Sequence, residues 1–169
     1  MSGGPRPLWR RPEPWWLAGI VVADQITKWL VFHRIPLYDS VEVLPGLLNL
    51  THVRNTGAAF GMFNSADFAY KGVVVAVLAA LALLALVWYA RQVMHESWAT
   101  RTAFVLIIAG AIGNLIDRAT VGYVLDFVDV MFGTWHFWAF NIADAAITVG
   151  AVIFFADALF NHRHVSETA

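Results

Sequence analysis

Four long apolar stretches alternate with polar intervals along this chain. They cover residues 15–32, 68–89, 102–118 and 140–160. Each has close to the roughly 20 residues that a helix needs to cross the hydrocarbon core of a bilayer. The pattern therefore predicts a membrane all-α protein with four transmembrane helices, forming a single domain over residues 1–169.

The polar interval after the first apolar stretch contains two short runs typical of β-strands. Residues 40–44 and 47–53 flank a Pro-Gly pair, which is typical of a tight turn. We therefore expect a small extramembrane β region within residues 36–64. A second polar interval, residues 119–138, is expected outside the membrane, with part of it at the interface.

The composition supports a membrane protein. Hydrophobic residues make up 59% of the chain and charged residues 14%, whereas a soluble domain carries about 25% charged residues. The net charge of -1 gives no support for a nucleic-acid partner. The absence of cysteine excludes disulfides, thiolate metal sites and cysteine nucleophiles.

The distribution of Lys and Arg predicts the orientation in the membrane. With four spans, both ends of the chain share a side, and that side holds Arg6, Arg10, Arg11, Arg91, Arg101 and Arg163. The opposite side holds Arg34, Arg54, Lys71 and Arg118. Because basic residues favour the cytoplasmic side, we expect both termini in the cytoplasm and the β region on the outer face.

Ionisable residues within or beside the apolar stretches are few, and their burial in a bilayer is costly. Asp24 and Lys28 interrupt the first stretch, and their spacing of four residues places them on one helix face, where they can pair. Asn114, Asp117 and Arg118 close the third stretch. We expect Asp24, Lys28 and Asp117 to be structural polar residues, with Asp117 pairing with Arg118 or Lys28. The Arg118 guanidinium can hold a carbonyl or phosphate oxygen.

Asp126 and Asp144 are the candidate catalytic residues. Two carboxylates brought together at a membrane surface share one proton, so that one can deprotonate a water while the other protonates a leaving group. Asn141 and Asp144 also fit a simpler role as the cap and first turn of the fourth helix. Spacing alone does not distinguish Asp126 from Asp129, which lies three residues later.

Other hydrolytic designs fit poorly. The chain has neither a Gly-x-Ser-x-Gly motif nor a His-Glu-x-x-His motif, and its six histidines are scattered. A metal site built from Asp126, Asp129 and Asp144 stays open as an alternative to a metal-free carboxylate pair.

Five motifs, taken in chain order, resemble those of the lipoprotein signal peptidase family, also called signal peptidase II. They are Asp24-x-x-x-Lys28, Arg54-Asn55-Thr56-Gly57-Ala58-Ala59-Phe60-Gly61, Gly110-x-x-Gly113-Asn114-x-x-Asp117-Arg118, Val124-Leu125-Asp126-Phe127 and Phe140-Asn141-Ile142-Ala143-Asp144. Each motif is weak alone, whereas five in the family's order are specific. The resemblance covers nearly the whole chain.

The resemblance implies an aspartyl endopeptidase of the bacterial inner membrane, with four transmembrane helices and a small periplasmic β-cradle that places the site near the periplasmic face. It implies that Asp126 and Asp144 are the catalytic pair and that Asp129 is not. The residues that it implies to bind substrate or support the aspartates are Asn55, Asn114, Arg118 and Asn141.

The resemblance also implies the substrate and the inhibitors. The substrates would be diacylglyceryl-prolipoproteins, cut just before the lipidated lipobox cysteine, and the enzyme would be blocked by globomycin-type inhibitors. No cofactor or metal is implied. Membrane lipid is an expected partner, because an acylated substrate can enter sideways from the bilayer.

A small proton-coupled membrane transporter subunit is the main alternative. Asp24, Lys28, Asp117 and Asp144 could form a proton relay within the membrane. The acidic residues gather at one face of the predicted bundle, however, and a relay across the bilayer would require them to be spread over its depth. A non-enzymatic membrane scaffold is disfavoured by the same polar residues.

Overall fold

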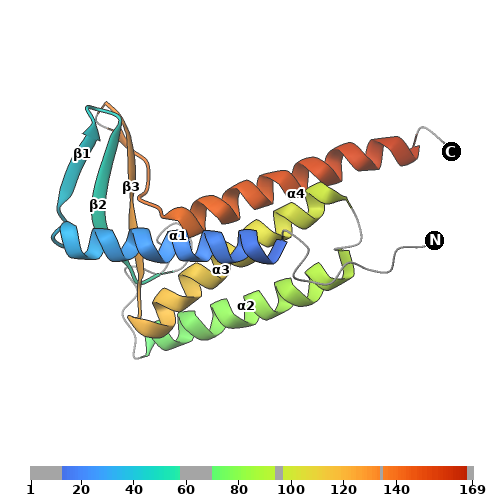
Figure 1. The fold of residues 1–169 in the computed structure, drawn as a ribbon, viewed down its shortest axis with the longest axis horizontal. Coiled ribbons are helices and arrows are strands. Elements are labelled where there is room, and N and C mark those ends of the chain that lie inside the picture. The colour runs from blue at the N-terminus through green and yellow to red at the C-terminus, as the bar shows by residue number, and fades with distance from the viewer. Residues whose placement is uncertain (1–12, 58–69, 94–96, 134, 167–169) are drawn as a thin grey trace.

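The computed structural model describes residues 13–57, 70–93, 97–133 and 135–166, with side chains up to residue 160. These residues form four helices packed side by side and a small sheet at one end of them (Figure 1). The helices are α1 (Glu13–Arg34), α2 (Lys71–Val93), α3 (Trp98–Thr120) and α4 (Ile142–Ser166). The strands are β1 (Ser40–Leu44), β2 (Leu48–Asn55), β3 (Val124–Phe132) and β4 (Trp135–His136).

The mainly helical architecture with a small sheet agrees with the prediction from sequence. Among the described residues, three helices are long and apolar enough to cross a membrane: Lys71–Val93, Trp98–Thr120 and Ile142–Phe160. Helix α1 is not among them, because Asp24 and Lys28 lie in its middle and lower its hydropathy. Its crossing of the membrane therefore stays a prediction.

The sheet is antiparallel, in the order β1-β2-β3-β4. Strands β1 and β2 lie where the sequence predicted them, whereas β3 comes from the interval that we expected outside the membrane or at its interface. Strand β3 is buried on both faces over most of its length, so its sequence lacks the polar alternation that marks a half-exposed strand. Part of residues 36–64, from residue 58 onward, lies outside the described residues.

A small apolar core joins the sheet to the helices. Val31 and Ile35, at the end of α1, pack with Leu125 and Phe127 of β3. Helices α3 and α4 approach each other closely at Gly110 and near Ala143. The core and this close contact place β3 and the first turn of α4 beside the end of α3.

The ends of α3 and α4 far from the sheet are joined by a separate polar contact. Asp157 accepts hydrogen bonds from the hydroxyl groups of Ser97 and Thr100, at 2.5 Å and 2.6 Å. Ser97 also caps α3 by accepting a hydrogen bond from the backbone nitrogen of Thr100. The two helices are therefore fixed at both ends.

Candidate active site

The first turn of α4 is closed by a reciprocal cap. The side-chain oxygen of Asn141 accepts a hydrogen bond from the backbone nitrogen of Asp144 at 2.9 Å. In return, Oδ2 of Asp144 accepts from the backbone nitrogen of Asn141 at 3.3 Å. The predicted helix cap is therefore confirmed, and it leaves Oδ1 of Asp144 available to groups outside α4.

Strand β3 brings Asp126 to the same place. Its carboxylate accepts hydrogen bonds from the side-chain nitrogens of Asn141, at 2.7 Å, and of Asn55, at 3.1 Å. Asn55 is the last residue of β2, and the pairing of β2 with β3 places it opposite Val124. Two of the amides predicted to line the site therefore hold one of the two predicted aspartates.

A third amide, Asn114 of α3, links the two aspartates. Its side-chain nitrogen donates to Oδ1 of Asp144 at 2.7 Å, and its oxygen accepts from the side-chain nitrogen of Asn141 at 3.3 Å. Because Asn141 also donates to Asp126, the path from one carboxylate to the other runs through two buried amides. A pair of carboxylates held in this way can share a proton and activate a water.

The surroundings of Asp126 shift its ionisation toward neutral pH. Burial, followed by repulsion from the Asp144 carboxylate, raises the pKa of Asp126 from 3.8 to about 7. Hydrogen bonds from Asn55 and Asn141, together with the charge of Lys28, oppose this rise. Asp126 is therefore partly protonated near neutral pH, which suits a residue that exchanges protons during a reaction.

A buried ionic cluster lies beside these amides. The predicted pair of Asp24 and Lys28 is present at 2.8 Å, and Lys28 rather than Arg118 is the partner of Asp117, at 2.9 Å. Asp24 also accepts from the backbone nitrogen of Ala143 at 2.9 Å, and Asp117 from that of Leu125 at 3.2 Å. The cluster therefore fixes the start of α4 and the start of β3.

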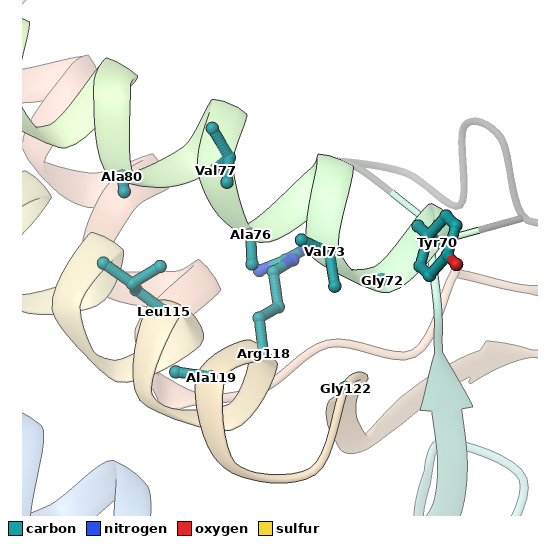
Figure 2. Close-up of a pocket in the computed structure, with 10 residues that line it drawn as sticks. All are labelled: Tyr70, Gly72, Val73, Ala76, Val77, Ala80, Leu115, Arg118, Ala119 and Gly122. Carbon is teal, nitrogen blue, oxygen red and sulfur yellow. The ribbon is translucent and has the colours of Figure 1, made fainter.

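Arg118 turns from the end of α3 toward α2. Its guanidinium donates to the backbone oxygens of Gly57, at 3.0 Å, and Asn114, at 3.2 Å. Figure 2 shows its side chain between α3 and α2. It lines a groove there whose volume is about 640 Å³. The groove is lined mainly by small and apolar side chains, among them Val73, Ala76 and Leu115.

Asp129 does not join the pair. It lies three residues from Asp126 on β3, so the two side chains point to opposite faces of the strand. Its carboxylate contacts Nδ1 of His136 on β4 at 3.0 Å. Within the described ranges, no three His, Asp or Glu side chains are placed to hold a metal ion, so the alternative site of Asp126, Asp129 and Asp144 is not assembled.

Gln25 is a residue beside the site that was not predicted from the sequence. Its side-chain nitrogen donates to Oδ1 of Asp117 at 2.9 Å and to the backbone oxygen of Gly113 at 3.2 Å. It therefore joins α1 to α3 beside the ionic cluster. Its position next to Asp24, in the only polar run of an apolar stretch, was the signal that could have identified it.

Comparisons with known proteins agree with this arrangement. A family described as signal peptidase (SPase) II matches residues 16–160. A lipoprotein signal peptidase of Shewanella halifaxensis is 39% identical over 154 residues, covering 91% of this chain and 89% of that protein. One of Geobacter metallireducens is 39% identical over 147 residues, covering 87% and 90%.

The fold has similar solved structures as well. A bacterial membrane enzyme determined by the in meso method at 2.3 Å resolution has a TM-score of 0.75 and 31% identity. The match covers 89% of this chain and 88% of that one. A similar structure at 1.9 Å resolution has a TM-score of 0.74. With the family match over residues 16–160, these likenesses show that the chain belongs to the signal peptidase II family, whose members are aspartic-type peptidases.

Proposed function

We propose that this protein removes the signal peptide from diacylglyceryl-modified prolipoproteins by cutting just before the lipidated lipobox cysteine. The observation that carries the proposal is the pair of aspartates joined through buried amides, in a chain whose relatives are named lipoprotein signal peptidases. Asp126 and Asp144 are the catalytic residues. Asn55, Asn114 and Asn141 hold them.

The reaction needs one proton on the pair at the start. The ionised carboxylate takes a proton from a water, and the water oxygen bonds to the carbonyl carbon that precedes the cysteine. The protonated carboxyl donates a hydrogen bond to the carbonyl oxygen, on which negative charge develops. As the C–N bond breaks, the leaving amine takes a proton from the pair, and the products are a carboxylic acid and the free amino group of the cysteine.

Arg118 and its groove suit the lipid part of such a substrate. The guanidinium can donate to a substrate carbonyl or to ester oxygens of the diacylglyceryl group. The apolar lining between α2 and α3 suits an acyl chain that enters from the bilayer. A globomycin-type inhibitor would compete for the same position. The proposed partners are therefore prolipoproteins, membrane lipid and such inhibitors.

The cleavage test uses purified protein in lipid and detergent with a diacylglyceryl-prolipoprotein, and product is followed by gel shift. We expect cleavage before the modified cysteine and the same rate in excess EDTA, because two carboxylates and a water suffice for the chemistry. A transporter subunit would show no cleavage. Loss of the rate in EDTA, with recovery on adding one divalent ion, would contradict the metal-free mechanism.

The proposed arrangement in the bacterial inner membrane has four spans, with α1 as the first of them. Both termini lie in the cytoplasm and the sheet lies at the periplasmic face, so that the single domain of residues 1–169 has its site beside the outer leaflet. The support is the three helices long enough to cross and the basic N-terminal segment.

Reporter fusions at three positions test this topology. We expect a cytoplasmic signal after Val93, between α2 and α3, and periplasmic signals after Glu42 and Gly133, both of which lie in the sheet region. Each fusion is made with two reporters, one active only in the periplasm and one active only in the cytoplasm, so that each controls for the other. A cytoplasmic signal after Glu42 would contradict the orientation, because it would place the site on the wrong side for release of signal peptides.

A further inference from the structure

Lys28 is buried, with 4% of its surface exposed, and all three of its ammonium protons have an acceptor. Two acceptors are the carboxylates of Asp24 and Asp117, at 2.8 Å and 2.9 Å. The third is the side-chain oxygen of Asn114, at 3.1 Å. Charge pairing accounts for the first two contacts and leaves the contact with a neutral amide to be explained.

That third contact fixes which end of Asn114 faces the aspartates. An ammonium group only donates hydrogen bonds, so the amide end beside Lys28 must be the oxygen. The amide nitrogen then points the other way, where it donates to Oδ1 of Asp144 at 2.7 Å. Lys28 thereby holds a donor against Asp144 without touching it.

The same contact acts on the second carboxylate. The oxygen of Asn114 that faces Lys28 also accepts from the side-chain nitrogen of Asn141, at 3.3 Å. That nitrogen donates to Asp126 at 2.7 Å, while the other end of the Asn141 amide accepts from the backbone nitrogen of Asp144. One ammonium group therefore orients two amides, of which Asn114 donates to Asp144 and Asn141 donates to Asp126.

We propose that Lys28 is a positioning residue for the reaction, which orients Asn114 and Asn141 so that each presents an amide donor to one of the two aspartates. The proposal rests on the proposed function, since it assigns a role in that same site. It differs from the structural role expected from sequence, in which Lys28 only neutralises Asp24 and Asp117.

The charges around Lys28 come from every element packed against it. Asp24 lies on the same helix, Asp117 comes from α3, and Asp126 and Asp144, which the charge of Lys28 also reaches, come from β3 and α4. The charge of Lys28 lowers the pKa of Asp126, and so does the hydrogen bond from Asn141. Loss of Lys28 therefore raises the pKa of Asp126 and moves the pH profile of cleavage to higher pH.

The variants Lys28→Met and Lys28→Gln form a matched pair. The two side chains are similar in length and uncharged, but only Gln can donate to the oxygen of Asn114. We expect kcat for Lys28→Met to fall by about tenfold to a hundredfold, the usual effect of losing one hydrogen bond to a charged group, with little change in KM. Lys28→Gln should be several-fold faster than Lys28→Met.

A double-mutant cycle with Asn114 separates positioning from folding. In the Asn114→Ala background, Lys28→Met should have less than about threefold further effect on kcat, because the amide that Lys28 orients is gone. A merely structural Lys28 would change the melting temperature, while the rate per folded molecule would stay as in wild type. Equal losses with and without Asn114 would also overturn the proposal.

A double variant and an infrared titration test the proposal further. If Lys28→Met does not fold, the double variant Asp24→Asn/Lys28→Met is compared with Asp24→Asn alone. Asp24→Asn removes one of the two buried carboxylates that Lys28 would otherwise leave unpaired, so the comparison still tests the contact of Lys28 with Asn114. Infrared titration of the protonated carboxyl band gives the pKa of Asp126 without substrate, and the band is assigned by its loss in Asp126→Asn. A band that titrates at the same pH in Lys28→Met and Lys28→Gln contradicts the proposal, because both variants lack the charge and only Gln can donate to Asn114. Wild-type protein that fails to cleave contradicts the proposed function alone.

Discussion

Asp126→Asn and Asp144→Asn should each abolish cleavage of a diacylglyceryl-prolipoprotein while leaving a folded protein. An amide can neither take a proton from water nor return one to the leaving amine, so the loss should reach at least about 1,000-fold in kcat. The substitution nearly preserves the volume of each side chain, and both positions retain an oxygen that accepts from Asn141. The measurement is the rate of cleavage per folded molecule.

Asp129→Asn is the matched control. It is the same chemical change on the same strand, but the side chain that it alters contacts His136 and lies away from the shared amides. We expect substantial activity to remain. An inactive Asp129→Asn beside an active Asp126→Asn would mean that the pair has been assigned to the wrong carboxylate.

The same aspartate should give the enzyme a dependence on pH. The pair must carry one proton, so the rate of cleavage should fall as pH rises through about 7, the pKa of Asp126. Because this pKa lies above the unfolded value near 3.8, protonated Asp126 contributes stability fully below about pH 4, and the contribution is lost as pH rises through about 7. Asp126→Asn should lack that slope in a plot of melting temperature against pH.

Gly110→Ala should have the largest effect of any single added methyl group in the helices. A Cβ at this position would overlap the backbone oxygen of Ala143 and lie 2.8 Å from Cγ1 of Ile147, so α3 and α4 would have to separate. Overpacking of this kind costs about 1–3 kcal/mol. Because Ala143 precedes Asp144, the displacement would also carry that carboxylate away from Asp126, and misplacement by about 1 Å costs on the order of a hundredfold in rate.

Gly19→Ala is the control for this prediction. Gly19 also lies inside a helix, but a Cβ there meets no atom of another described element within 4 Å. Alanine favours a helix over glycine by about 1 kcal/mol, so Gly19→Ala should be neutral or stabilising. Melting temperature and cleavage rate, measured on both variants, give the comparison. Equal behaviour of the two would mean that the close contact of α3 and α4 does not position the site.

Local spacing explains which parts of the site were predictable from sequence. Asp24 and Lys28 are one helical turn apart, and Asn141 and Asp144 have the spacing of a helix cap, so each pair follows from a single element. The partner of Asp117 stayed open between two residues because the choice depends on how α1 packs against α3. That packing is a contact between elements distant in the chain, which no local pattern encodes.

Strand β3 is the part of the fold that could not be predicted from the sequence. Its pairing with β2 joins segments separated by both α2 and α3, and its buried faces erase the alternation that identifies a strand. The contact of Asn55 with Asp126 depends on that pairing and could be expected only from the family resemblance. The opposite faces of Asp126 and Asp129 follow at once when the segment is known to be a strand.

The spacing of Asp24 and Lys28 has a consequence for the synthesis of the protein. Lys28 reaches Asp117 only after α3 has been made, yet in the proposed topology α1 enters the membrane first. A lone Asp or Lys at the centre of an inserting helix costs about 2.5–3.5 kcal/mol. Because the two residues pair within α1 itself, at 2.8 Å, the newly made helix can enter the bilayer with its charges already matched. When α3 is inserted later, two protons of the Lys28 ammonium group are still available to donate to Asp117 and Asn114.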